Sequence, residues 1–257
     1  MNVIDLNSDM GEGYGVYALG DDEAMLDIVT SANIACGFHA GDPLVMARTL
    51  AAAKARGVGT GAHPSFFDLW GFGRRPIVGE RPGDVEKQIV YQIGALQALA
   101  AAEGARVGHV KAHGALANLA NQDAELAGAI ARAIKTAAPD AIFVVMPGLE
   151  SEKAGEAFGL KLAREVYADR AYDDDGALVS RRLPGAVLHD AADAAARVLA
   201  ILESGEIVSV GGRRIPVKAD TICVHGDTAG AVAMARAVRD RLELAGWTIR
   251  PMAKWIG

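Results

Sequence analysis

Polar side chains recur at every second position in two segments that are otherwise largely apolar. They are Asp5, Asn7 and Asp9 in the first segment and His109, Lys111 and His113 in the second. Side chains two residues apart in a β-strand lie on one face of the sheet, so we expect each set to form one polar row. Carboxylate, imidazole and ammonium groups gathered in this way can transfer protons, stabilise negative charge or bind a metal ion.

Most of the histidines share one kind of position, on a predicted strand or at its carboxyl end. Five of the six do so, namely His39, His63, His109, His113 and His225. In parallel α/β folds the carboxyl ends of the strands meet on one face, where ligands bind. Any one of these histidines could be a hydrogen-bonded core residue, but five together favour a shared site.

Each polar residue type suggests a chemical role. Asp9 or Glu12 could act as a general base, with a histidine as acid or base. Lys111 could stabilise negative charge on a carbonyl or phosphate oxygen. The sequence pairs Arg74-Arg75 and Asp169-Arg170 could hold a substrate carboxylate or phosphate, because a guanidinium binds such groups in bidentate fashion. Structural ion pairs are an equal alternative for each arginine.

A divalent metal ion is another use for the same side chains. His109 and His113 would lie about 13 Å apart along a strand, which is too far for one ion. His39 and His63 end adjacent strands about 5 Å apart, and Asp9 could be the third ligand. Lys111 would compete with such a cation.

Several common sites have no signature in the chain. There is no Gly-x-Ser-x-Gly elbow and no Walker A sequence, and Gly11-x-Gly13-x-Gly15 lacks the spacing of a dinucleotide site. We therefore expect activated water rather than a serine nucleophile, and no P-loop for any ATP that the reaction uses.

Short β-favouring runs alternate with amphipathic runs along the whole chain. The predicted strands are 3–8, 32–36, 58–62, 107–112, 141–146, 162–168 and 221–225, and the predicted helices are 21–30, 43–55, 82–103, 122–137, 149–157, 189–203 and 229–245. This order predicts parallel strands joined by helical crossovers, in a closed barrel or an open doubly wound sheet. Residues 207–217 read as a surface hairpin turning at Gly211-Gly212.

The polar rows indicate where the site lies within this fold. A charged row facing the helix layer would carry a large desolvation cost, so we expect it to face a wet barrel interior that is the active site. With no linker or repeat in sequence, the chain is expected to form one catalytic domain over 1–257.

Composition narrows the class of protein. The chain has 257 residues and a formal charge of −6, which argues against a nucleic-acid partner. Its 2 cysteines make neither a disulfide framework nor a zinc motif. No signal-peptide pattern or long apolar run is present, so we expect a cytoplasmic protein with no membrane partner.

Seven segments together resemble the LamB/YcsF family. They are residues 5–12, 30–42, 61–65, 71–75, 110–116, 168–172 and 224–227, and the second, TSANIACGFHAGD, is highly specific. The resemblance implies a distorted (β/α)7 TIM-like barrel of the glycoside hydrolase/deacetylase type. It also implies ATP-dependent ring-opening hydrolysis of 5-oxo-L-proline to L-glutamate, as the A subunit of a 5-oxoprolinase that works with separate B and C subunits and uses ATP through them.

In that reaction, this chain would receive the phosphorylated lactam and deliver water to it. Asp9, Glu12 and His113 would manage the water's protons, and Lys111, Arg74 or Arg75 would meet the phosphate. The expected substrate-binding residues are Asn7, His39, His63, Arg74, Arg75, Arg170, His225 and Asp227.

Two alternatives remain open from the sequence. A metal-dependent deacetylase or amidohydrolase acting on a sugar or small amide would use Asp9, His39 and His63. A non-catalytic regulatory protein would only bind a partner, and replacing its interior carboxylates would leave that partner effect intact.

Overall fold

The computed structural model describes residues 2–227 and 230–256. Seven parallel strands form a closed barrel, in which the last barrel strand pairs with both β6 and β1. The barrel strands are β1 (Val3–Met10), β2 (Ser31–Ala35), β3 (Gly59–His63), β4 (Val107–Lys111), β5 (Ile142–Val145), β6 (Lys161–Tyr167) and β9 (Thr221–Cys223). The distorted (β/α)7 barrel expected from the sequence is confirmed.

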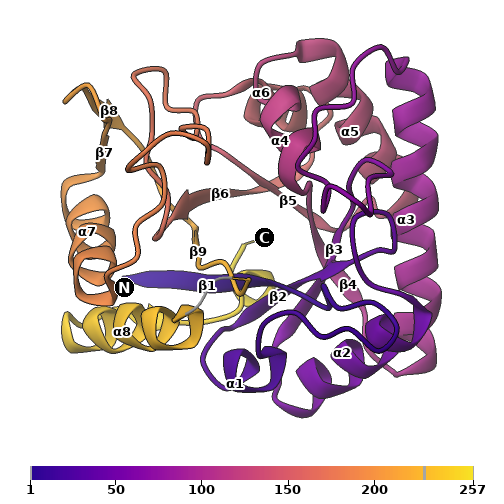
Figure 1. Ribbon diagram of the computed structural model, residues 1–257, viewed down its shortest axis with the longest axis horizontal. Coiled ribbons are helices and arrows are strands. Elements are labelled where there is room, and N and C mark those ends of the chain that lie inside the picture. Colours follow the sequence, from indigo (N-terminus) through magenta and orange to yellow (C-terminus); the bar gives the residue numbers. More distant parts are fainter. Residues whose placement is uncertain (1, 228–229, 257) are drawn as a thin grey trace.

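Helices surround the barrel (Figure 1). They are α1 (Asp22–Leu26), α2 (Pro43–Ala55), α3 (Pro82–Ala102), α4 (Gly114–Ala120), α5 (Ala124–Ala137), α6 (Glu150–Ala157), α7 (Ala191–Ser204) and α8 (Ala231–Leu244). Helix α3 buries Val85, Ile89, Ile93 and Leu96, which recur at helical spacing and pack in the main core. No described helix is long and apolar enough to cross a lipid bilayer.

The helix starts follow from local sequence. The side chain of Asp42 accepts hydrogen bonds from the N–H groups of Leu44 and Val45, and Pro43 occupies the first turn of α2. Helix α1 ends at Leu26, earlier than the predicted residue 30. Helix α4 was not predicted, because it is short and begins directly after the polar row of β4.

The amino-terminal end of the barrel is covered by the end of the chain. Strand β10 (Thr248–Ile249) pairs with the start of β1, and the short 3-10 helix η1 (Met252–Lys254) follows it. Met252 is fully buried in a small apolar cluster with Ile142, Val144 and Ala163. Its N–H donates to Asp5 Oδ1 at 3.1 Å. The polar interior is thereby covered at this end.

Strands β7 (Glu206–Val208) and β8 (Arg214–Pro216) form an antiparallel hairpin separate from the barrel. The hairpin lies between α7 and β9 in the chain, and Figure 1 places it at the edge of the molecule. The predicted surface insertion is therefore confirmed.

Candidate active site

The lower interior of the barrel is a buried hydrogen-bonded network. Asn7 Nδ2 donates to Glu165 Oε1 at 2.9 Å and to Thr221 Oγ1 at 2.7 Å. Asn33 Nδ2 donates to Asn7 Oδ1 at 2.7 Å. His109 Nε2 lies 2.9 Å from Asn33 Oδ1. The side chain of Asn7, which was expected to bind substrate, thus makes its hydrogen bonds to other protein side chains.

A glycine on the neighbouring strand makes room for His109. A Cβ atom at Gly61 would lie 2.2 Å from Cδ2 of the His109 ring. Burial lowers the pKa of His109 to about 3, so the ring is neutral at neutral pH. His109 therefore acts as a packed, neutral interior residue, apart from the other histidines.

Asp9 and Lys111 form a buried ion pair above this network. Lys111 Nζ lies 3.0 Å from Asp9 Oδ1 and 2.9 Å from Glu165 Oε1. Burial alone would raise the pKa of Asp9, but His63 and Lys111 hold it well below its ordinary value. Burial would likewise lower the pKa of Lys111, but Asp9 and Glu165 raise it. Both groups therefore stay charged.

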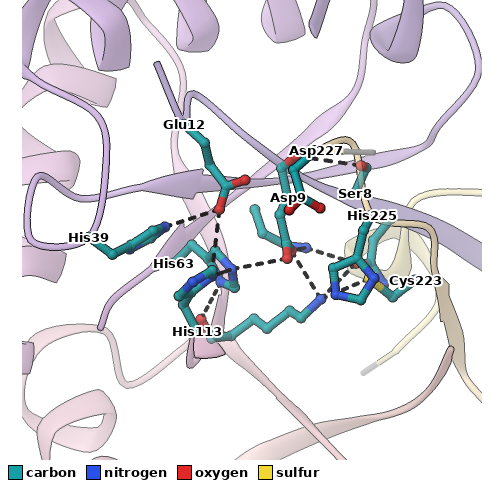
Figure 2. Close-up of polar contacts among 12 residues, drawn as sticks. Ser8, Asp9, Glu12, His39, His63, His113, Cys223, His225 and Asp227 are labelled. Carbon is teal, nitrogen blue, oxygen red and sulfur yellow. Dashed lines mark hydrogen bonds and ion pairs between the residues drawn. The ribbon is translucent and has the colours of Figure 1, made fainter. Parts of the chain in front are cut away.

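Glu12, His39, His63 and His113, here called the imidazole cluster, converge beside Asp9 (Figure 2). Their candidate ligand atoms all lie within 4.8 Å of one another. His39 Nε2 is 3.1 Å from Glu12 Oε1, and His113 Nδ1 is 2.9 Å from His63 Nε2. The rings of His39 and His113 stack with centroids 3.8 Å apart. Asp9 contacts the cluster through Oδ2, 3.3 Å from His63 Nε2.

The cluster contains one carboxyl group and three imidazole rings, and two of these rings are held neutral by burial. Burial lowers the pKa of His39 and His113 well below the ordinary value. Burial, together with the charges of Asp9 and Asp227, raises the pKa of Glu12. Of the three metal ligands expected from the sequence, His39 and His63 lie in this cluster. The third, Asp9, contacts His63 at the edge of the cluster and also groups with Cys223 and His225.

A tight turn holds His113 in place. His113 Nε2 lies 2.9 Å from the carbonyl oxygen of Phe72, which has a positive φ of 54°. The next residue, Gly73, has φ of 63°, and a Cβ atom there would lie 2.7 Å from His113 Cδ2. Gly73 is therefore explained by close backbone approach to the cluster, whereas a Cβ atom at Gly71 would meet the side chains of Asp68 and Arg75.

On the other side of Asp9, His225 and Asp169 form a pair. His225 Nδ1 lies 2.8 Å from Asp169 Oδ2 and 2.9 Å from Asp169 Oδ1. Burial would raise the pKa of Asp169, but His225 holds it below its ordinary value. A carboxylate that accepts the Nδ1–H of a neutral imidazole leaves the Nε2 lone pair available for proton transfer.

A cavity of about 560 Å³ opens above these groups. Asp9, Lys111 and His225 lie on its wall. Its basic lining residues also include five arginines, namely Arg74, Arg75, Arg170, Arg181 and Arg182. This excess of positive charge makes the cavity suited to a small anion.

Three of these arginines already have protein partners. Arg74 Nη2 lies 2.6 Å from Asp227 Oδ2. These two residues, both expected to bind substrate, therefore form an ion pair with each other. Arg75 pairs with Asp68, with Nε 2.8 Å from Oδ1. Arg170 Nη2 donates to the carbonyl oxygen of Val179 at 2.6 Å. Burial and the charge of Arg181 lower the pKa of Arg170, an effect that a bound anion would offset.

Sequence reasoning missed several residues of the site. Glu165 and Tyr167 alternate on β6, so the two-residue period that found the rows on β1 and β4 could have found them as well. Arg181 and Arg182 lie in an irregular loop after β6, where no period points to the cavity. Asp169 was considered only as a substrate clamp with Arg170, whereas its carboxylate contacts His225.

Comparison with known proteins agrees with this architecture. The A subunit of a 5-oxoprolinase from Rhodopseudomonas palustris is 56% identical over 254 residues, covering 99% of this chain and 100% of the relative. A lactam utilization protein from Thermus thermophilus superposes with a TM-score of 0.90 at 44% identity, covering 96% of this chain and 99% of that one. A T48 deacetylase, at 14% identity and a TM-score of 0.50 over 98% of this chain and 88% of its own, shares the fold alone. The model of the LamB/YcsF family matches residues 4–257, and this chain therefore belongs to that family.

Proposed function

We propose that this chain is the A subunit of a 5-oxoprolinase and carries out the ring opening of 5-oxo-L-proline to L-glutamate. The full-length similarity to the A subunit of a Rhodopseudomonas palustris 5-oxoprolinase supports the activity. The observation that carries the assignment to this site is the arginine-lined cavity over the Asp9–Lys111 pair. Its charge and size suit a small carboxylate-bearing ring.

The division of work with ATP and partner subunits follows from the chemistry of the substrate. A five-membered lactam is a poor electrophile, and phosphorylation of its amide oxygen makes the ring carbon reactive. Because the chain lacks a P-loop sequence, we assign the ATP-dependent step to the B and C subunits. The phosphorylated lactam would then be the form that enters this cavity.

The arginines and Lys111 are proposed to bind the two anionic groups of that intermediate. Arg170, Arg181 and Arg182 can hold a carboxylate or phosphate by charge-assisted hydrogen bonds. Lys111 lies at the cavity wall beside Asp9, where it can stabilise negative charge on the oxygen of the ring carbon. Asp9 and Glu165 hold the ammonium group in position.

His225 is proposed to move the protons. Its Nε2 takes a proton from water as the water oxygen bonds to the ring carbon. The ring nitrogen takes that proton as the tetrahedral adduct forms. The carbon–nitrogen bond then breaks while the hydroxyl proton of the adduct passes to the leaving nitrogen, which departs as an amine as the carbonyl forms. The product is an acyl phosphate, which a second water hydrolyses to glutamate and inorganic phosphate. Asp169 fixes the tautomer of His225 throughout.

An exposed apolar surface next to the site is our candidate contact for the partner subunits. Tyr14, Tyr17, Leu19, Leu69 and Trp70 line a hollow that also reaches Glu12 and His39. Tyr17 is 78% exposed and Trp70 is 95% exposed, which is costly for large apolar side chains unless another surface covers them. A partner subunit bound here would lie next to Glu12 and His39 of the candidate active site.

Reconstitution tests the proposal. The purified chain is assayed for glutamate formation from 5-oxo-L-proline alone, with ATP, and with ATP plus the B and C subunits. We expect turnover only in the complete mixture, and Trp70→Glu should weaken complex formation while Tyr91→Glu, an exposed aromatic change on α3, should not. Turnover by the chain alone without nucleotide would contradict the division of work.

A metal-dependent amidohydrolase is the second candidate, because the imidazole cluster adjoins Asp9. It predicts hydrolysis of a small N-acetyl amide by the chain alone, without ATP and sensitive to a chelator. The same purified chain distinguishes the two functions.

A further inference from the structure

The side-chain nitrogen and oxygen atoms of the imidazole cluster point toward one another. His63 Nδ1 lies 2.7 Å from the carbonyl oxygen of Lys111, so this nitrogen must carry the hydrogen. His113 Nε2 must carry a hydrogen for the same reason, because it faces the carbonyl oxygen of Phe72. The other ring nitrogens of these residues, His63 Nε2 and His113 Nδ1, lie 2.9 Å apart, and His63 Nε2 also lies 3.3 Å from Asp9 Oδ2.

The two other members of the cluster add to this convergence. Glu12 Oε1 lies 3.5 Å from His113 Nδ1 and 3.1 Å from His39 Nε2. Among the described residues, the ion pairs of Glu12 are with these histidines alone, and none is with a lysine or arginine. The buried carboxylate therefore has no permanent positive charge in contact with it. Imidazole nitrogens and a carboxyl oxygen that converge in a buried pocket are the atoms that commonly bind a metal ion.

The four atoms lie close enough together to bind one ion. Bonds of about 2.0–2.1 Å to a tetrahedral ion place neighbouring ligand atoms roughly 3.3 Å apart. Three of the six separations, 2.9, 3.1 and 3.5 Å, lie around that value, and all six are within 4.8 Å. The outward hydrogen bonds of His63 and His113 to backbone carbonyls are the kind that orient metal-binding imidazoles.

We propose that Glu12, His39, His63 and His113 form a binding site for one divalent transition-metal ion of the zinc class. Three imidazole nitrogens and one carboxylate oxygen are a donor set typical of such ions. Lys111 does not oppose the ion, since Asp9 and Glu165 compensate its charge. When bound, the ion would supply Lewis acidity beside the cavity. This inference is independent of the proposed reaction.

Metal binding can be measured without substrate, nucleotide or partner subunits. The full-length chain is stripped with a chelator, dialysed and titrated with Co²⁺ and then Zn²⁺. We expect one equivalent of Co²⁺ with the intense visible absorption of a four-coordinate ion, displaced by Zn²⁺. Elemental analysis should give one zinc per chain. X-ray absorption should show imidazole and carboxylate ligands at about 2.0–2.2 Å.

Variants locate the ion. Glu12→Gln and His63→Gln should each weaken Zn²⁺ binding by more than about 100-fold. His109→Gln, another buried histidine of the same barrel, should bind one ion with unchanged affinity. Circular dichroism checks that each variant is folded. If a variant does not fold, the metal stoichiometry and absorption spectrum of the wild type still test the site. Failure of the wild type to bind a stoichiometric ion, or full affinity in both cluster variants, would overturn the site.

Discussion

The Nδ1 atom of His225, a buried residue on the cavity wall, lies 2.8 Å from Oδ2 of the buried Asp169. Because the carboxylate fixes which nitrogen carries the hydrogen, Asp169→Asn should reduce kcat by at least about 100-fold with a small change in KM. The measurement is steady-state kinetics of the complex with its partner subunits.

The matched control for this change is Asp190→Asn. Asp190 caps α7 with its side-chain oxygen, a role that asparagine retains, and it does not line the cavity. Its kinetics should be those of the wild type. A loss restricted to KM in Asp169→Asn would instead assign Asp169 to substrate binding.

Lys111→Met should abolish turnover and also destabilise the protein. The substitution leaves Asp9 and Glu165 buried together without their shared cation, at a cost of about 3–5 kcal/mol in the free energy of unfolding. Denaturant unfolding measures this cost. Adding Glu165→Gln should restore part of the stability and none of the activity. An active double variant would show that Lys111 serves only to compensate Glu165.

Arg181→Ala and Arg182→Ala should raise KM for the substrate by about 10-fold or more each, with kcat much less affected, since each removes a charge-assisted hydrogen bond to an anion. Arg236→Ala, an exposed change on α8, is the control and should leave KM unchanged. If KM is the same in all three variants, neither Arg181 nor Arg182 binds the substrate.

Asp5 predicts a pH dependence of stability. Burial raises the pKa of Asp5 from 3.8 to about 6, against four hydrogen bonds that lower it. The folded state therefore binds its proton more tightly than the unfolded state, and this contribution is fully present below pH 4 and lost as pH rises through about 6. It amounts to roughly 3 kcal/mol at most. The difference in unfolding free energy between wild type and Asp5→Asn should change across this window, and a constant difference would contradict the prediction.

The barrel could be predicted because its strands carry local patterns. The two-residue rows on β1 and β4 and the helical spacing on α3 depend on neighbours in the sequence, and the structure retains them. The rows also located Asp9 and Lys111 on facing walls of one interior. Their pairing at 3.0 Å follows once those strands close into a barrel.

Contacts made by irregular segments could not be predicted in this way. Met252 covers the end of the barrel because β10 aligns with the start of β1, a pairing of two residues with no detectable period. The positions of Arg181 and Arg182 depend on how a long loop folds over the cavity. The grouping of Glu12 with His113 likewise depends on the turn at Phe72, which side-chain periodicity does not reveal.

That turn gives a further prediction. Gly73→Ala places a Cβ atom 2.4 Å from Ser65 Oγ and 2.7 Å from His113 Cδ2, at a φ of 63°. Gly79→Ala has a comparable positive φ of 89° with open space around the new atom, so it isolates the backbone cost, which is about 1 kcal/mol. Gly73→Ala should be destabilised by more than Gly79→Ala, and it alone should lose affinity for Zn²⁺, because His113 must shift. Thermal unfolding and zinc titration of both variants test this. Equal losses in the two would mean that the turn adapts without moving the imidazole cluster.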